Sequence, residues 1–157
     1  MNIREFKPED AEAVIAVQNS VKDCLGDLYT KESIVQNSSY INFFVAEDEG
    51  KIVGYIGFTD LKNGIGMTLS LAVAKGQHGK GVGGALIEKV KEYATANSFR
   101  KILTLVRVNN AAMIGLAKKT GFVEEGILKR HFRTGEDVMY LSYFIEANYP
   151  EDQRQTN

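Results

Sequence analysis

The stretch Ser70 to Lys91, SLAVAKGQHGKGVGGALIEKVK, decides how this chain is interpreted. An apolar extended run gives way to five glycines within nine residues, and an amphipathic helical pattern follows. Glycines lack the Cβ atom that keeps a ligand away from the backbone, and they permit positive φ angles that turn N–H groups inward. The start of a helix adds unpaired N–H groups and a partial positive charge. The sequence therefore predicts an anion-binding loop with five glycines and two flanking lysines: Gly76, Gly79, Gly81, Gly83, Gly84, Lys75 and Lys80.

Other glycine motifs explain this stretch less well. Gly79 to Gly84 matches G-x-G-x-x-G, a dinucleotide pattern that is weak on its own. A dinucleotide unit places it after its first strand with an acid about 20 residues later, whereas several strands come first here and no acid lies around Thr104. A phosphate-binding P-loop lacks its Lys-Ser/Thr pair. A turn without a ligand stays open, but the entropic cost of glycine argues against it.

Composition limits the class of protein. The 157 residues are most simply one domain, residues 1–147, followed by a polar tail, residues 148–157. Apolar residues make up 44% and charged residues 25%, as in an ordinary soluble globular protein. The single cysteine, Cys24, forms no internal disulfide and argues against a structural zinc site, so no metal is expected.

Charge and hydropathy limit the partners and the location. The net charge of −1 gives no reason to expect nucleic acid as a ligand. No apolar run approaches the ~20 residues that span a bilayer, and the N-terminus lacks the apolar core of a signal peptide. We therefore expect a cytoplasmic protein that does not bind membranes. The sequence leaves a homodimer open.

Residue periodicity predicts an α/β fold. The short polar turn Asp48-Glu49-Gly50 favours a hairpin, and a right-handed crossover makes Met67–Ala74 parallel to Ile102–Val108. Asn110 is a suitable N-cap and Gly121 a suitable helix stop. Strands are expected at Asn2–Phe6, Ile41–Ala46, Ile52–Phe58, Met67–Ala74, Ile102–Val108, Phe122–Arg130 and Val138–Ile145; helices are expected at Pro8–Val21, Tyr29–Gln36, after the glycines, and from Asn110 to about Thr120.

Two motifs resemble the GNAT superfamily of N-acetyltransferases. The family pattern is a strand ending in a hydrophobic triplet, then Gln/Arg-x-x-Gly-x-Gly/Ala, which resembles Leu71-Ala72-Val73 followed by His78-Gly79-Lys80-Gly81-Val82-Gly83. The family's Asn-x-x-Ala-x-x-Leu-Tyr-x-Lys-x-Gly-Phe resembles Asn110 to Phe122. Glu125-Gly126 and His131 to Tyr143 resemble the closing hairpin of ribosomal-protein alanine and phosphinothricin-type acetyltransferases.

The resemblance implies the GNAT fold: a mixed, mostly antiparallel sheet of six to seven strands flanked by about four helices. It also implies transfer of an acetyl group from acetyl-coenzyme A (acetyl-CoA) to a primary amine, on a small molecule or a peptide N-terminus, by direct attack in a ternary complex. Asn110 would contact the pantetheine arm or act only as a helix cap. The residues expected to bind acetyl-CoA are Leu71, Ala72, Val73, His78, Gly79, Lys80, Gly81, Val82, Gly83, Gly84 and Asn110.

The catalytic residues are harder to assign. Ala117 stands where the family has the tyrosine that protonates the leaving thiolate, so Tyr140 or Tyr143 would have to substitute, although either also suits core packing. His78 replaces the family's Gln or Arg and suits a phosphate contact better than a base. Asp60, Glu32 and Asp137 are candidates for a base acting through water.

This gap favours a weakly basic acceptor. At pH 7 an alkylammonium with a pKa near 10.4 costs about 4.6 kcal/mol to deprotonate, whereas an α-amino group near 7.8 costs about 1 kcal/mol. The departures from the family pattern also leave a rival open, a non-catalytic protein that binds or senses acyl-CoA.

Overall fold

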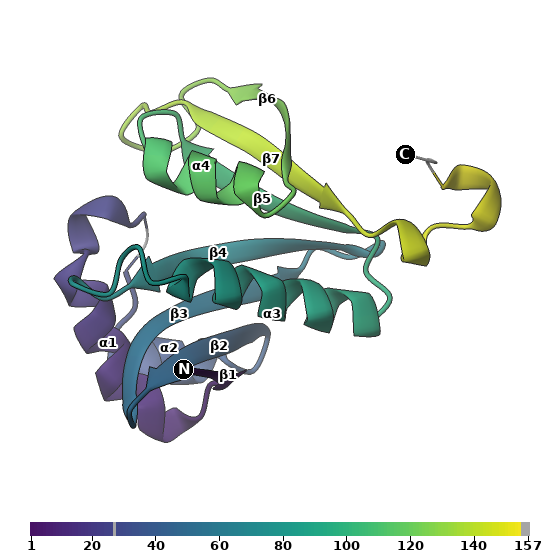
Figure 1. Ribbon diagram of the computed structural model, residues 1–157. Coiled ribbons are helices and arrows are strands. Elements are labelled where there is room, and N and C mark those ends of the chain that lie inside the picture. Colours follow the sequence, from purple (N-terminus) through teal and green to yellow (C-terminus); the bar gives the residue numbers. More distant parts are fainter. Residues whose placement is uncertain (27, 155–157) are drawn as a thin grey trace. The chain divides into compact units, whose positions relative to one another are not determined.

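We analysed a computed structural model that describes residues 1–26 and 28–154. The chain divides into two compact units. The first contains Met1–Thr59 and Thr68–Val90, and the second contains Asp60–Met67 and Lys91–Asn157. In the described ranges seven strands form one sheet in the order β1-β2-β3-β4-β5-β7-β6 (Figure 1). This confirms the predicted mixed, mostly antiparallel sheet.

The strands follow the predicted pattern closely. The β2–β3 turn consists of Glu49 and Gly50, with φ angles of 49° and 75°, which suits a two-residue hairpin. β4 and β5 pair in parallel through Ile65–Met67, as the crossover predicts. The strands are β1 (Asn2–Glu5), β2 (Ile41–Asp48), β3 (Lys51–Asp60), β4 (Ile65–Val73), β5 (Lys101–Arg107), β6 (Val123–Leu128) and β7 (Val138–Phe144).

Four α-helices occur in the described part of the chain: α1 (Ala11–Ser20), α2 (Lys31–Asn37), α3 (Val82–Ala96) and α4 (Ala111–Lys119). α1 is preceded by a 3₁₀ turn at Pro8–Asp10 and followed by another at Lys22–Cys24. α2 begins two residues later than predicted because the Thr30 hydroxyl accepts the Ser33 N–H and caps it.

The first unit has its core between α1, α2 and the sheet. Ala11, Val14 and Val17 form the apolar face of α1 and are buried there. Gly54 of β3 faces α3, because a Cβ atom at Gly54 would lie 2.9 Å from Val82 Cγ1 and 3.0 Å from the Ala72 carbonyl. The start of α3 therefore packs directly on the sheet, which fixes the segment between β4 and α3.

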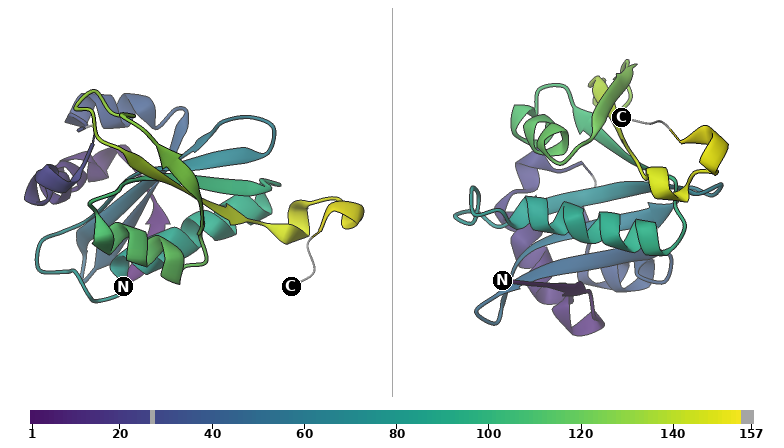
Figure 2. Two further views of the ribbon diagram at one scale, coloured as in Figure 1. Left: turned by 90° about the horizontal axis from the view of Figure 1, so that it is seen from above. Right: turned by 45° about the vertical axis from the view of Figure 1, so that its right-hand side comes forward.

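In the second unit α4 lies along β5 and β7 (Figures 1 and 2). Asn110 Oδ1 accepts the Met113 N–H at 3.1 Å, and Gly121 has a φ of 86°, so the predicted cap and stop of this helix are confirmed. After β7, the Asn148 side chain donates to the Thr95 and Phe99 carbonyls, at 3.0 and 2.8 Å. The predicted boundary at residue 148 stays a prediction, and residues 155–157 lie outside the described part.

Candidate functional site

The predicted anion-binding segment, residues 76–84, forms a loop between β4 and α3 and is called the glycine loop below. Gly76, Gly79 and Gly81 have φ angles of 86°, 78° and 82°. Gly83 and Gly84 instead lie in the first turn of α3 without positive φ, so this expectation was wrong for those two.

The start of α3 presents unpaired backbone donors. Its first helical hydrogen bond runs from the Ala85 N–H to the Gly81 carbonyl at 3.0 Å. The N–H groups of Val82, Gly83 and Gly84 precede that bond, and residues 1–26 and 28–154 provide no acceptor for them. Three donors at the positive end of a 15-residue helix suit an anion such as a phosphate.

Gly84 has no need of glycine for backbone or packing. Its φ is helical, and an added Cβ atom would meet no protein atom within 4 Å. Glycine costs about 1 kcal/mol relative to alanine inside a helix. Close approach of a ligand to the backbone would explain its presence, and the three N–H groups beside it fit an anion.

Part of β4 extends past its pairing with β5. Pairing with β5 ends at Met67, while β4 continues to Val73. Ala74 donates its N–H to Val53 of β3 at 2.8 Å, so alternation directs the backbone groups of Leu71 and Val73 to the opposite edge. Ser70, just before them, has a φ of 48°, a break in the strand that the sequence did not predict.

His78 is held against this same strand. Its Nε2 lies 2.8 Å from the Val73 carbonyl, and because a carbonyl only accepts, the imidazole donates there. Lys80 donates to Gln77 Oε1 at 2.9 Å, and the Lys75 N–H donates to the Ser20 hydroxyl at 3.2 Å. These contacts fasten the loop, while a phosphate contact of His78 or Lys80 stays a prediction.

The second unit holds the candidates for proton transfer. Tyr143 packs its ring on Phe122 at 5.7 Å and carries the Lys91 ammonium 4.3 Å above it. The Tyr140 ring lies 5.8 Å from the Lys101 ammonium. Ala117, where the family has tyrosine, is completely buried. Tyr143 therefore has a packing role, and proton donation by either tyrosine stays a prediction.

The candidate acids are poor bases. A hydrogen bond from the Lys62 N–H lowers the pKa of Asp60, and one from its own backbone N–H lowers the pKa of Glu32. The Lys129 ammonium, 2.7 Å away, lowers the pKa of Asp137. A carboxylate that is stabilised in its charged form accepts a proton less readily, so the geometry supports none of the three.

Two buried polar networks were missed by sequence reasoning. Gln18 is almost fully buried, donates to the Tyr29 carbonyl at 2.9 Å and accepts the Tyr29 N–H at 2.8 Å. Ser142, also buried, donates to Glu125, which pairs with Lys101 at 2.6 Å. A lone polar residue within an apolar pattern was the available signal in each case.

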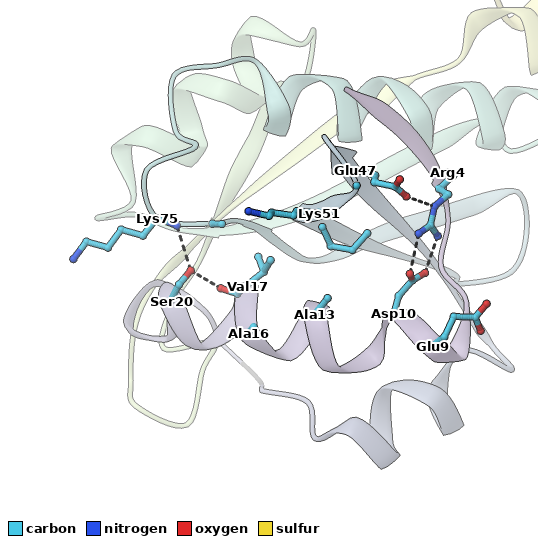
Figure 3. A pocket seen from close by; sticks show the side chains of 13 residues that line it. Arg4, Glu9, Asp10, Ala13, Ala16, Val17, Ser20, Glu47, Lys51 and Lys75 are labelled. Atoms are coloured by element: carbon cyan, nitrogen blue, oxygen red, sulfur yellow. Dashed lines mark hydrogen bonds and ion pairs between the residues drawn. The ribbon is translucent and has the colours of Figure 1, made fainter.

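A groove runs along α1 in the first unit (Figure 3). It has a volume of about 540 Å³, and Ala13, Ala16 and Val17 form its apolar side. At one end Arg4 binds Asp10 through two hydrogen bonds of 2.7 and 2.8 Å and Glu47 at 2.8 Å. The groove shares Lys75 with the segment that leads into the glycine loop, but its cations and acids balance and indicate no particular ligand.

The sequence matches the acetyltransferase (GNAT) family over residues 11–122, a span that includes the glycine loop and α4. The chain belongs to the GNAT acetyltransferase family. It is 34% identical over 112 residues to an N-alpha-acetyltransferase of Sulfurisphaera tokodaii, covering 64% of this chain and 67% of that protein. It is 32% identical over 145 residues to an uncharacterized N-acetyltransferase of Methanocaldococcus jannaschii, covering 90% of each.

The crystal structure of a ribosomal-protein-alanine N-acetyltransferase from Brucella melitensis is also similar, with a TM-score of 0.78 and 25% identity over 92% of this chain and 100% of that one. The predicted GNAT fold, enzyme class and resemblance to this branch are confirmed. GNAT enzymes use acetyl-CoA, so the family match argues against Gly79 to Gly84 as a dinucleotide-binding motif. Within residues 1–26 and 28–154 no helix is long and apolar enough to cross a membrane, and no metal-binding cluster occurs.

Proposed function

We propose that this GNAT enzyme binds acetyl-CoA in the glycine loop and acetylates the α-amino group of a peptide or protein. Binding of acetyl-CoA is inferred from the free N–H groups on Val82, Gly83 and Gly84, which lie beside three glycines with positive φ. These donors would hold the pyrophosphate. At the edge of β4, the backbone groups of Leu71 and the Val73 N–H would pair with the pantetheine amides as an added strand, while the Val73 carbonyl stays with His78.

The remaining predicted contact belongs to Asn110. Its Oδ1 caps α4, and its carboxamide would also reach the pantetheine arm. When bound, acetyl-CoA supplies the activated thioester. The chain then contributes by fixing the reacting groups relative to one another and by directing N–H donors at developing negative charge.

The choice of an α-amino group as the acetyl acceptor rests on the lack of a suitable base. Asp60, Glu32 and Asp137 all have lowered pKa values, and Ala117 offers no proton. An α-amine loses its proton at a cost of about 1 kcal/mol at pH 7, compared with about 4.6 kcal/mol for a lysine side chain. The similarity to an N-alpha-acetyltransferase supports the same acceptor class.

Release of the coenzyme A thiol tests this proposal. We expect a lysine-free peptide with a free N-terminal alanine to be turned over, the same peptide with a blocked N-terminus to be inert, and spermidine to be at least about tenfold slower. Turnover of spermidine without turnover of the free peptide would contradict the acceptor class. Binding of acetyl-CoA without thiol release on any amine would favour the non-catalytic rival.

The pH dependence follows from the same reasoning. Since the three candidate acids have lowered pKa values, their carboxylates are already ionised at neutral pH. We therefore expect kcat/KM for the peptide to rise with pH as one proton leaves the substrate, with a midpoint near ~7.8. A midpoint that stays fixed when the substrate amine is replaced by one of lower pKa would instead reveal an enzyme base.

A further inference from the structure

The β6–β7 hairpin separates its charges. The two acids that precede β7 are occupied: Glu136 accepts from Arg107 Nε at 3.1 Å, and Asp137 accepts from the Lys129 ammonium at 2.7 Å and the Arg130 N–H at 2.9 Å. Beyond them lies a group called here the basic tip. Its residues are Arg130, His131 and Arg133, all of them exposed.

The basic tip carries uncompensated charge. In the described ranges no acid pairs with the guanidinium of Arg130 or Arg133, although the whole chain has a net charge of −1. Guanidinium groups bind carboxylates through paired N–H donors. Two of them on one turn thus favour an acidic partner, and the charge arrangement disfavours a basic one.

The backbone around the basic tip is well defined. His131 donates its N–H to the Glu136 carbonyl at 2.9 Å, and Gly135 donates to the Phe132 carbonyl at 2.8 Å with a φ of 80°. Phe132 is half-buried, with the Arg107 guanidinium 5.2 Å from its ring centre. The arginines thus project from a hairpin that is already ordered, which lowers the entropic cost of binding.

The hairpin is also joined to the segment that leads to Asn110. Val108 donates its N–H to the Asp137 carbonyl at 3.2 Å, and Asn110 donates to the Arg107 carbonyl at 2.9 Å. Arg107 thereby contacts both Glu136 of the hairpin and the residue that caps α4. Within the second unit, the basic tip and the predicted pantetheine contact therefore belong to the same end of β5.

We propose that the basic tip selects acceptor peptides that carry acidic side chains just after the free N-terminus. This inference rests on the proposed function, because it assigns the acceptor of that reaction. Arg130 and Arg133 bind the carboxylates of the peptide, and the hairpin holds the N-terminal amine on the side of Asn110. The selection operates through charge, so it weakens as salt screens the arginines.

Peptide binding tests the inference without requiring turnover. The probes are peptides labelled at the C-terminus that begin Ala-Asp-Glu, Ala-Gln-Gln or Ala-Lys-Lys, measured by fluorescence anisotropy with the full chain and acetyl-CoA. We expect the acidic peptide to bind at least about tenfold more tightly than the neutral one, and R130Q/R133Q to lose that preference. The control K51Q/K119Q removes the same two charges from exposed positions and should change binding less than about twofold.

Equal binding of acidic and neutral peptides would overturn the inference, as would an equal loss in the control variant. Tighter binding of a single-stranded RNA than of the acidic peptide, abolished by R130Q/R133Q, would also overturn it and assign the tip to nucleic acid. If the acidic preference holds but no peptide releases thiol, the tip is supported as a binding surface and the proposed function fails. Thiol release with all three peptides at equal rates leaves the function standing and removes the selectivity.

Discussion

His78 shows how one hydrogen bond assigns a role at the residue scale. The sequence left two roles for His78, a base or a phosphate contact. In the structure its Nε2 donates to the Val73 carbonyl at 2.8 Å. A histidine occupied in this way fastens the loop to β4. The motif alone predicts the loop but not this bond, because side-chain direction depends on the folded backbone.

We therefore expect His78→Gln to remain active. Glutamine keeps an N–H donor, so kcat should fall less than about threefold, whereas loss of a general base typically costs about 10²–10⁴-fold. Steady-state thiol release measures this. A drop beyond about 100-fold with unchanged binding of acetyl-CoA would assign His78 to catalysis instead.

Two substitutions of Tyr143 separate a catalytic role of its hydroxyl from a packing role of its ring. Its ring contacts Phe122 and Lys91, so Tyr143→Phe should leave both kcat and the melting temperature nearly unchanged. Tyr143→Ala should lower the free energy of unfolding by about 3 kcal/mol, since it removes a packed aromatic ring. A large loss of kcat in Tyr143→Phe at unchanged stability would show that the hydroxyl donates a proton.

At the scale of elements, the start of α1 depends on a charge network. Asp10 accepts from the Arg4 guanidinium and, at 2.8 Å, from the Lys7 N–H, and Arg4 chiefly lowers its pKa. Lys7 stands at the cap position, where lysine is not a preferred residue. Asp10, the third residue of the 3₁₀ turn, caps the turn by accepting the Lys7 N–H. The residue type at the cap position does not reveal this reversed arrangement.

Asp10→Ala should lower stability by about 2–4 kcal/mol at pH 7, because Arg4 and the Lys7 N–H lose a nearly buried partner. This corresponds to a melting temperature about 4–16 °C lower. A depressed folded-state pKa gives stability that is present above the unfolded value, so the wild-type advantage should shrink as the pH falls below about 4. An advantage that persists undiminished at pH 2 would contradict this, and Glu9→Ala, an exposed neighbour, is the control.

Two matched glycines test whether the start of α3 binds acetyl-CoA. Gly84 and Gly115 are both helical, and both have open space where a Cβ atom would lie. Valine is at least as good as glycine inside a helix, so neither substitution to valine should lower the melting temperature. Gly84→Val should weaken binding of acetyl-CoA at least about tenfold, or 1.4 kcal/mol, and Gly115→Val less than about twofold. Equal effects would remove the glycine loop from the site.

At the scale of the whole molecule, local patterns predicted the elements well and the chemistry poorly. Alternation, the two-residue turn and the Asn110 cap each depend on neighbours in sequence, and all were recovered. The break at Ser70, the Gln18 network and the lowered pKa of Asp137 arise only in the folded chain, where Tyr29 and Tyr55 reach Gln18 and Lys129 reaches Asp137. No periodicity encodes them. The cytoplasmic location, the homodimer and the absence of nucleic-acid and membrane partners stay predictions.

The proposed function depends most on the glycine loop as a site for acetyl-CoA. Isothermal titration of the full chain with acetyl-CoA, and separately with NAD, tests it most directly. We predict one acetyl-CoA site per chain with a Kd of about 1–100 μM, or roughly 5–8 kcal/mol, and no heat of binding for NAD. Binding of NAD with equal affinity, or no binding of acetyl-CoA at about 1 mM, would contradict it.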